Sequence, residues 1–315
     1  MILGHLARGA VLVLASYAVV STLASAVLLS MGGRLTRRPR RQAAAEARRL
    51  FAARLAPVVA GTAVAAGVAL AYALWEPAGA IEPVGPVALG LAAAGATLLA
   101  HGTARAVGAL LQTSRLQRSL PGGGGRLLPG VHVPVSIVEA DFPIVAIAGL
   151  VTPRLFVARH VVDACSTGEL RAIVSHELAH LAARDNLRRL LLHAAPDLVS
   201  CTPTGARLAR DWALASELAA DDAASADPAE RLDLASALVK VARLAVGRHT
   251  PLAASALYQG GPVTERVHRL IDGPVTPATV SRTPVAIAGG VVAGTPVWVP
   301  IAYDLFEALL RLGGR

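Results

Sequence analysis

Residues 175–185 read SHELAHLAARD. His176 and His180 are four residues apart, so on a helix both side chains lie on one face and can bind the same ion. Two imidazoles at this spacing are typical of a zinc site. Glu177 follows the first histidine and is turned about 100° around the helix. It therefore lies beside the ion without binding it, where it can accept a proton from a water molecule that attacks a peptide carbonyl.

A second pair of residues at the same spacing offers the third ligand. Glu217 and Asp221 enclose the segment ELAAD, which begins 37 residues after His180. A catalytic zinc ion has three protein ligands and one open position. We expect Glu217 to be the third ligand, and Asp221 to accept a hydrogen bond from the far ring nitrogen of His176. The alternative for such acids is a solvated helix face, which is the assignment we give to Asp222.

The residues around these motifs predict short strands followed by helices. Three short runs have the apolar composition of strands: 131–137, 142–148 and 155–158. Three longer runs have the apolar spacing of helices: 167–193, 207–224 and 228–246. Ser166 or Thr167 is a candidate cap for the first helix. This part of the chain is therefore predicted to be an α+β domain with a small sheet.

The remaining sequence is typical of a membrane protein. Four stretches of 21 to 25 residues contain no Asp, Glu, Lys or Arg: 9–33, 55–75, 84–104 and 283–303. A helix needs about 20 apolar residues to cross a bilayer. Hydrophobic residues make up 54% of the chain and charged residues only 16%, which agrees with four transmembrane helices. A buried loop and helix is the alternative for the fourth stretch, because three prolines interrupt it.

The arginines predict how the chain crosses the membrane. Eight of them lie between Arg34 and Arg54, and a loop rich in Arg stays on the cytoplasmic side. The N-terminus is then outside, and the domain after the third helix is cytoplasmic. We predict a multi-pass protein of the cell membrane with three parts: 1–118 with three transmembrane helices, 119–282 as a cytoplasmic zinc-binding domain, and 283–315 with the fourth helix.

The charge and the cysteines exclude other classes of protein. The net charge of +9 is concentrated beside apolar stretches, where arginines set topology and contact anionic lipid, so we expect no binding of nucleic acid. The two cysteines, Cys165 and Cys201, predict no disulfide framework. A transporter is disfavoured, because His101 is almost the only ionisable residue in the four apolar stretches.

The motifs together resemble a known group of enzymes. HELAHLAARD at 176–185, followed by ELAAD at 217–221, is similar to the gluzincin membrane peptidases. These include the BlaR/MecR-type antirepressor family and the related heat-shock and CAAX-protease family. AGLVTPRLFV at 148–157 resembles the strand and turn that precede the metal helix in both. Three apolar helices before the domain and one after it match the antirepressor family better.

The resemblance implies an activity and further site residues. It implies a zinc-dependent endopeptidase that cleaves a cytoplasmic regulator, such as a transcriptional repressor, or a membrane protein. The strand at 142–148 would bind the substrate backbone, or else be a plain core strand. Arg266 matches a functional arginine, and Arg266 or His268 is the candidate donor to the developing oxyanion. The sequence ends at Arg315, so the extracellular sensor domain of the antirepressors is not expected here.

A different class of function also fits the composition. The chain could be a non-enzymatic membrane scaffold that keeps a zinc site for its structure. Glu177 argues against this alternative, since a structural zinc site has no need of a base beside the metal.

Overall fold

The computed structural model of the chain describes residues 2–35, 42–77, 84–119, 133–246, 263–273, 300–301 and 303–308. Helices account for most of these residues, and a single small sheet of three strands accompanies them in the described part. To this extent the prediction of a mainly α protein with a small sheet is confirmed.

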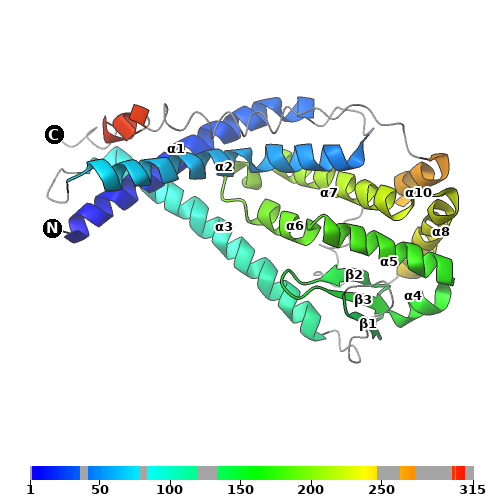
Figure 1. The fold of residues 1–315 in the computed structure, drawn as a ribbon. Coiled ribbons are helices and arrows are strands. Elements are labelled where there is room, and N and C mark those ends of the chain that lie inside the picture. Colours follow the sequence, from blue (N-terminus) through cyan, green and yellow to red (C-terminus); the bar gives the residue numbers. More distant parts are fainter. Residues whose placement is uncertain are drawn as a thin grey trace.

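Three long helices come first: α1 (Ile2–Leu35), α2 (Ala43–Trp75) and α3 (Pro86–Ser119). Each is long and apolar enough to cross a membrane. At 1.5 Å per residue each helix is about 50 Å long, which exceeds the roughly 30 Å of a bilayer's hydrocarbon core. Figure 1 shows α1 and α2 side by side, whereas α3 diverges from them and ends next to the sheet. The predicted fourth span, 283–303, lies outside the described residues except at 300, 301 and 303.

The sheet contains β1 (Val135–Val138), β2 (Val145–Ala148) and β3 (Arg154–Ala158) in the order β1-β3-β2. β1 runs parallel to β3, and β2 runs antiparallel to it. Each strand overlaps the run of residues predicted for it. The turn from β2 to β3 contains Gly149 with a φ of 106°, a conformation that glycine adopts without steric cost. The strand order makes β2 an edge strand of the described sheet, and the helix formed by Thr167–Ala182 contacts it.

The predicted helix at 167–193 is wrong in one respect, because the chain forms two helices there. After the short α4 (Arg159–Ala164) come α5 (Thr167–Ala182) and α6 (Asp185–Ala194). Ser166 caps α5 and forms a capping box with Glu169. Arg184 separates α5 from α6 with a φ of 56° and a ψ of 38°, the left-handed conformation that ends a helix. The apolar spacing continues across this break, which is why the sequence predicts a single helix.

The remaining helices of the domain agree better with the predictions. They are the 3₁₀-helix η1 (Leu198–Cys201), α7 (Pro203–Ala224), α8 (Pro228–Ala245) and α10 (Val263–Asp272). α7 begins four residues before its predicted start, because Thr202 caps it and Pro203 occupies its first turn. Asp227 caps α8 with a capping box to Glu230.

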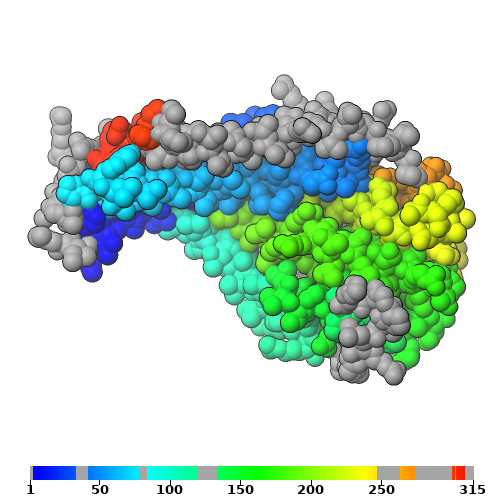
Figure 2. All heavy atoms as spheres, viewed as in Figure 1, coloured from blue at the N-terminus to red at the C-terminus, as the bar shows by residue number. Residues whose placement is uncertain are grey.

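Buried apolar side chains join the long helices α1 and α2 to the domain. One cluster lies between the sheet, α5 and α8. Another combines Leu28 of α1 and Leu50 of α2 with Leu192, Leu208 and Trp212 of the domain. Figure 2 shows that the arm of α1 and α2 projects beyond a rounded body. The predicted boundary at 118/119 stays a prediction, but this second core crosses it.

The loop between α6 and η1 inserts among the three long helices. The hydroxyl of Tyr17 in α1 donates to the carbonyl of Pro196 at 2.6 Å. Arg54 of α2 forms a fully buried ion pair with Asp197 at 2.6 Å. Only glycine fits at position 102 of α3, because a Cβ there would lie 2.5 Å from the carbonyl oxygen of Ala194. The loop is thus fixed to all three long helices.

Candidate metal centre

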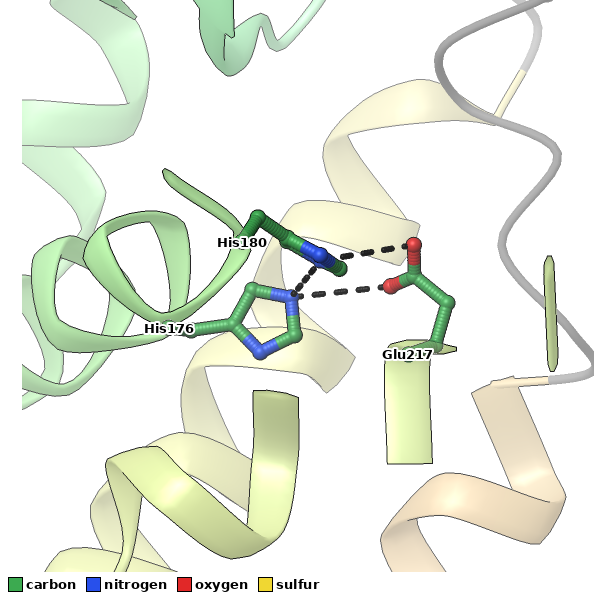
Figure 3. A group of neighbouring side chains, drawn as sticks. All are labelled: His176, His180 and Glu217. Atoms are coloured by element: carbon green, nitrogen blue, oxygen red, sulfur yellow. Dashed lines mark hydrogen bonds and ion pairs between the residues drawn. The ribbon is translucent and has the colours of Figure 1, made fainter. Parts of the chain in front are cut away.

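The structure brings His176, His180 and Glu217 together. Both histidines project from α5, and Glu217 projects toward them from α7 (Figure 3). Potential ligand atoms of the three side chains all lie within 4.8 Å of one another. The two Nε2 atoms are 3.2 Å apart, and each lies 3.5 Å from an oxygen of Glu217.

These separations suit a tetrahedral zinc ion. Zinc binds nitrogen and carboxylate oxygen at about 2.0–2.2 Å, so two ligand atoms in a tetrahedral arrangement lie about 3.4 Å apart. The 3.2 Å between the two Nε2 atoms is close to that value, and so is the 3.5 Å from each Nε2 to one oxygen of Glu217, with the two histidines facing different oxygens of the carboxylate. Two nitrogens and one carboxylate are also the ligand types of catalytic zinc sites that leave one position open.

Asp221 holds the far side of His176. Its Oδ1 lies 3.0 Å from Nδ1 of His176, one turn of α7 beyond Glu217. Arg266 of α10 donates to both oxygens of Asp221, at 2.8 and 2.6 Å, and lies 2.9 Å from Glu217. Asp221, Glu217 and Arg266 are all buried. The Nε2 atom of His176 is thus turned toward Glu217, where an ion would lie.

Asp185 plays the matching part for His180. Its Oδ2 lies 2.8 Å from Nδ1 of His180 and accepts a hydrogen bond of 2.5 Å from Ser216 of α7. A continuous helix would not place residue 185 beside His180. The break at Arg184 turns the chain back, so that Asp185 begins α6 with its carboxylate against the imidazole. Both histidines therefore have an acid at Nδ1 and a ligand position at Nε2.

The acidic side chains favour the protonated, positively charged form of both imidazoles. Burial disfavours a charged His180, but its bonds with Asp185 and Glu217 outweigh that effect and raise its pKa to about 10. The pKa of His176 is also raised, since Asp221 and Glu217 more than offset its burial. Burial alone would raise the pKa of Glu217, yet its contacts with the two histidines and Arg266 bring it well below its usual range. A divalent cation bound by the two imidazoles would also neutralise the negative charge of these carboxylates.

Glu177 lies next to the edge strand. Its Oε2 accepts a hydrogen bond of 3.1 Å from the backbone N–H of Ile147 in β2. Asn186 donates to the carbonyl of the same residue at 2.9 Å. Gln117 near the end of α3 donates to the carbonyl of Ala148 at 3.2 Å. The strand beside the site is thus held by the metal helix, by α6 and by a long helix of the N-terminal region.

A cavity of about 110 Å³ opens at this centre. His176, His180, Glu177, Glu217 and Arg266 line it. The structure does not bring His268 into the site, because this residue lies on the exposed face of α10 and does not line the cavity. Turns of 100° per residue place positions 266 and 268 on different faces of a helix, which separates the two.

Some neighbours of the centre have no clear signal in the sequence. Asn186, Ser216 and Gln117 act through bonds that depend on how the helices pack. The cavity wall from α8 could have been found, because Leu234, Ala237 or Leu238, and Val241 recur at helical spacing.

A histidine pair on one helix and a carboxylate on another define a candidate metallopeptidase centre. A protein-family model described as BlaR1 peptidase M56 matches residues 133–270, somewhat less than half of the chain. The matched region is similar to this family of peptidases, and the resemblance to BlaR/MecR-type membrane peptidases is confirmed. The match includes the sheet, α5 and α7. No curated protein and no solved structure matches the chain.

Proposed function

We propose that this chain is an integral-membrane zinc endopeptidase, with His176, His180 and Glu217 as the metal ligands. The observation that carries the proposal is the convergence of these three side chains at separations suited to zinc, with Glu177 beside them. When bound, a zinc ion would polarise the peptide carbonyl and lower the pKa of the attacking water to about 7.

Glu177 is the proposed base. Its carboxylate takes a proton from the water as the water oxygen adds to the carbonyl carbon. It then passes that proton to the amide nitrogen, so that the carbon–nitrogen bond breaks and a carboxyl and an amine are formed. Its hydrogen bond with the N–H of Ile147 supports this role, because the bond holds the carboxylate between the metal ligands and the strand.

Arg266 and Asp221 have proposed positioning roles. The bidentate contact between them orients Asp221 toward His176, and Arg266 also neutralises part of the negative charge of Glu217. That Arg266 is in addition the donor to the oxyanion stays a prediction, supported by its place in the cavity lining.

The edge of β2 is the proposed binding site for the substrate backbone. The side chains of Glu177 and Asn186 form hydrogen bonds with the outward N–H and C=O of Ile147. Outward backbone groups recur at every second residue of an edge strand, so Val145 also presents its N–H and C=O at this edge. An extended peptide that pairs with β2 would form backbone hydrogen bonds with Val145. At Ile147 it would replace the side chains of Glu177 and Asn186 as the hydrogen-bond partner.

A cytoplasmic site is the proposed orientation, because the arginines between Arg34 and Arg54 favour that side. The proposed substrate is accordingly a cytoplasmic regulator or the cytoplasmic part of a membrane protein. The family description names a BlaR1 peptidase, which supports a repressor as one candidate substrate.

The test compares Glu177→Gln with the wild type. Both proteins are purified in detergent, their zinc content is measured by elemental analysis, and their cleavage of casein and of the chain itself is followed. We expect equal zinc content and a loss of cleavage of at least about 100-fold, because only the base is removed. Glu139→Gln is the matched control, since Glu139 is exposed and lies outside the cavity.

Two results would contradict the proposal. Cleavage by Glu177→Gln at the wild-type rate would exclude the base. A wild type that binds one zinc ion but cleaves no protein would favour the scaffold. The physiological substrate is then sought by comparing the proteomes of cells that carry the wild type and Glu177→Gln.

A further inference from the structure

One part of the cavity lining, which we call the aliphatic wall, is made of apolar side chains, although the same cavity contains the candidate metal ligands. Helix α8 contributes Leu234, Ala237, Leu238 and Val241 to the lining. Ile173 of α5 and Val145 of β2 continue the same surface. These side chains come from three different elements and include no charged or hydrogen-bonding group.

The rotation of α8 is fixed by a buried carboxylate behind this wall. Glu169 of α5 accepts hydrogen bonds from Ser236 at 2.5 Å and from Lys240 at 2.7 Å. Ser236 and Lys240 directly precede the lining residues Ala237 and Val241 of α8. Because both are turned toward Glu169, the aliphatic face of the helix is turned toward the cavity.

The wall lies beside the atoms that would react. Ile173 is one helical turn before Glu177 on α5, and both line the cavity. Val145 is two residues before Ile147, whose N–H donates to Glu177. Both residues therefore present their backbone N–H and C=O groups to the same edge of β2, and Val145 also lines the cavity. A peptide bond placed at Glu177 would therefore have a neighbouring side chain against this wall.

We propose that the wall is a specificity pocket for an aliphatic side chain directly beside the scissile bond, and that Leu238 limits the size of that side chain. The inference rests on the proposed peptidase function and names its substrate class. An aliphatic group gains by leaving water there, whereas a charged group would lose its hydration without finding a partner. Leu238 is only partly buried, so the pocket can change at this position without loss of the core beneath it.

The experiment uses the full chain in detergent with zinc and a set of quenched fluorescent peptides. The peptides share one cleaved sequence and differ only at the two positions that flank the scissile bond, with Leu, Phe, Asp or Lys there. We expect the Leu peptide to be cleaved about tenfold faster or more than the Asp and Lys peptides at one of the two positions. Equal rates at both positions would overturn the inference.

Variants at Leu238 locate the preference in the structure. Leu238→Ala should raise the ratio of Phe to Leu cleavage several-fold at that same position, because it enlarges the pocket. Leu238→Lys should raise the ratio of Asp to Leu cleavage, because it supplies a partner for a carboxylate. Leu232→Ala is the matched control on the same helix, with Leu232 59% exposed and outside the cavity lining. The inference is wrong if both Leu238 variants keep the wild-type ratios.

Binding separates this inference from the proposed function. In Glu177→Gln, labelled peptides should still bind with a preference for Leu over Asp, since the pocket does not require the base. Preferential binding by a wild type that cleaves nothing would support the pocket and overturn the peptidase. Cleavage by the wild type, with no preference in either binding or cleavage, would overturn the pocket alone.

Discussion

The carboxylate of Asp185 lies 2.8 Å from Nδ1 of His180, although the two residues belong to different helices. The contact depends on Arg184, whose left-handed backbone ends α5 and starts α6. An L-residue with a side chain pays roughly 1–2 kcal/mol in that conformation. The chain accepts this cost at the position that turns a carboxylate toward a proposed metal ligand.

We expect Asp185→Asn to weaken zinc binding about 10- to 100-fold, because the amide cannot supply the charge that orients and polarises His180. Ser216→Ala should have a smaller effect in the same direction. Titration of the metal-free protein against a zinc chelator of known affinity measures both. Asp163→Asn, an exposed acid of α4, is the control, and equal affinity of Asp185→Asn and this control would contradict the assignment.

Zinc should also stabilise the fold through Glu217. A ligand that binds only the folded state stabilises it by about 2.7 kcal/mol at a free concentration of 100 times its Kd. We therefore expect the melting temperature of the chelator-treated wild type to rise when zinc is returned, and that of Glu217→Gln to rise much less. Asp222→Asn, on the same helix but exposed, should respond as the wild type does. An equal response of all three proteins would contradict Glu217 as a ligand.

The ion pair between Arg54 and Asp197 should show a large coupling. Both side chains are buried, so either single change leaves one charge without its partner, and we expect Arg54→Met to lower the free energy of unfolding by about 3–5 kcal/mol. Asp197→Asn keeps an acceptor for the N–H of Ser200 while it removes the charge. The double variant should be more stable than the sum of the two single losses implies, as measured by unfolding in detergent. Strictly additive losses would contradict a coupled pair.

Glu169 predicts a dependence of stability on pH. Burial would raise the pKa of this carboxyl, but hydrogen bonds from Lys240, Ser236 and the N–H of Ser166 outweigh it and lower the pKa from 4.5 to about 2. A lowered pKa in the folded state means that the contribution is complete above about pH 4.5 and is lost as the pH falls toward 2.

We accordingly expect Glu169→Gln to be less stable than the wild type at pH 7, by about 1–3 kcal/mol. The difference between the two proteins should shrink between pH 4.5 and pH 2. Unfolding of both proteins across this range provides the measurement. A difference that stays constant down to pH 2 would show that the ionised carboxylate is not what stabilises the contact of α5 with α8.

The sequence predicts the parts of the fold that depend on local spacing. The three long apolar helices, the strands and most helices of the domain follow from periodicity and capping residues. The residues proposed as ligands are also local in origin, since His176 with His180, and Glu217 with Asp221, are each pairs one helical turn apart. Their distance along the chain carries no signal, but the chemistry of a three-ligand site is sufficient to join the pairs.

What the sequence does not predict depends on tertiary geometry. Nothing local distinguishes Arg184 from the neighbouring helical residues, so the break and the contact of Asp185 with His180 cannot be foreseen. Both Arg266 and His268 lie on a short amphipathic helix, and only packing decides that the first is buried and the second exposed. The hydrogen bond from Gln117 to the carbonyl of Ala148 likewise depends on the direction of α3 relative to the sheet, which the sequence does not indicate.

Ala43 of α2 belongs to the same buried cluster as Leu214 and Leu218, which lie on either side of Glu217 in α7. One turn or more along α2, Leu50 packs in another buried cluster with Trp212 of α7. A fragment that starts after α3 would turn this whole side of α7 to water. The peptidase-like domain is therefore not expected to stay intact as a separate fragment, because α2 also supplies part of the interior that surrounds the proposed zinc ligand Glu217.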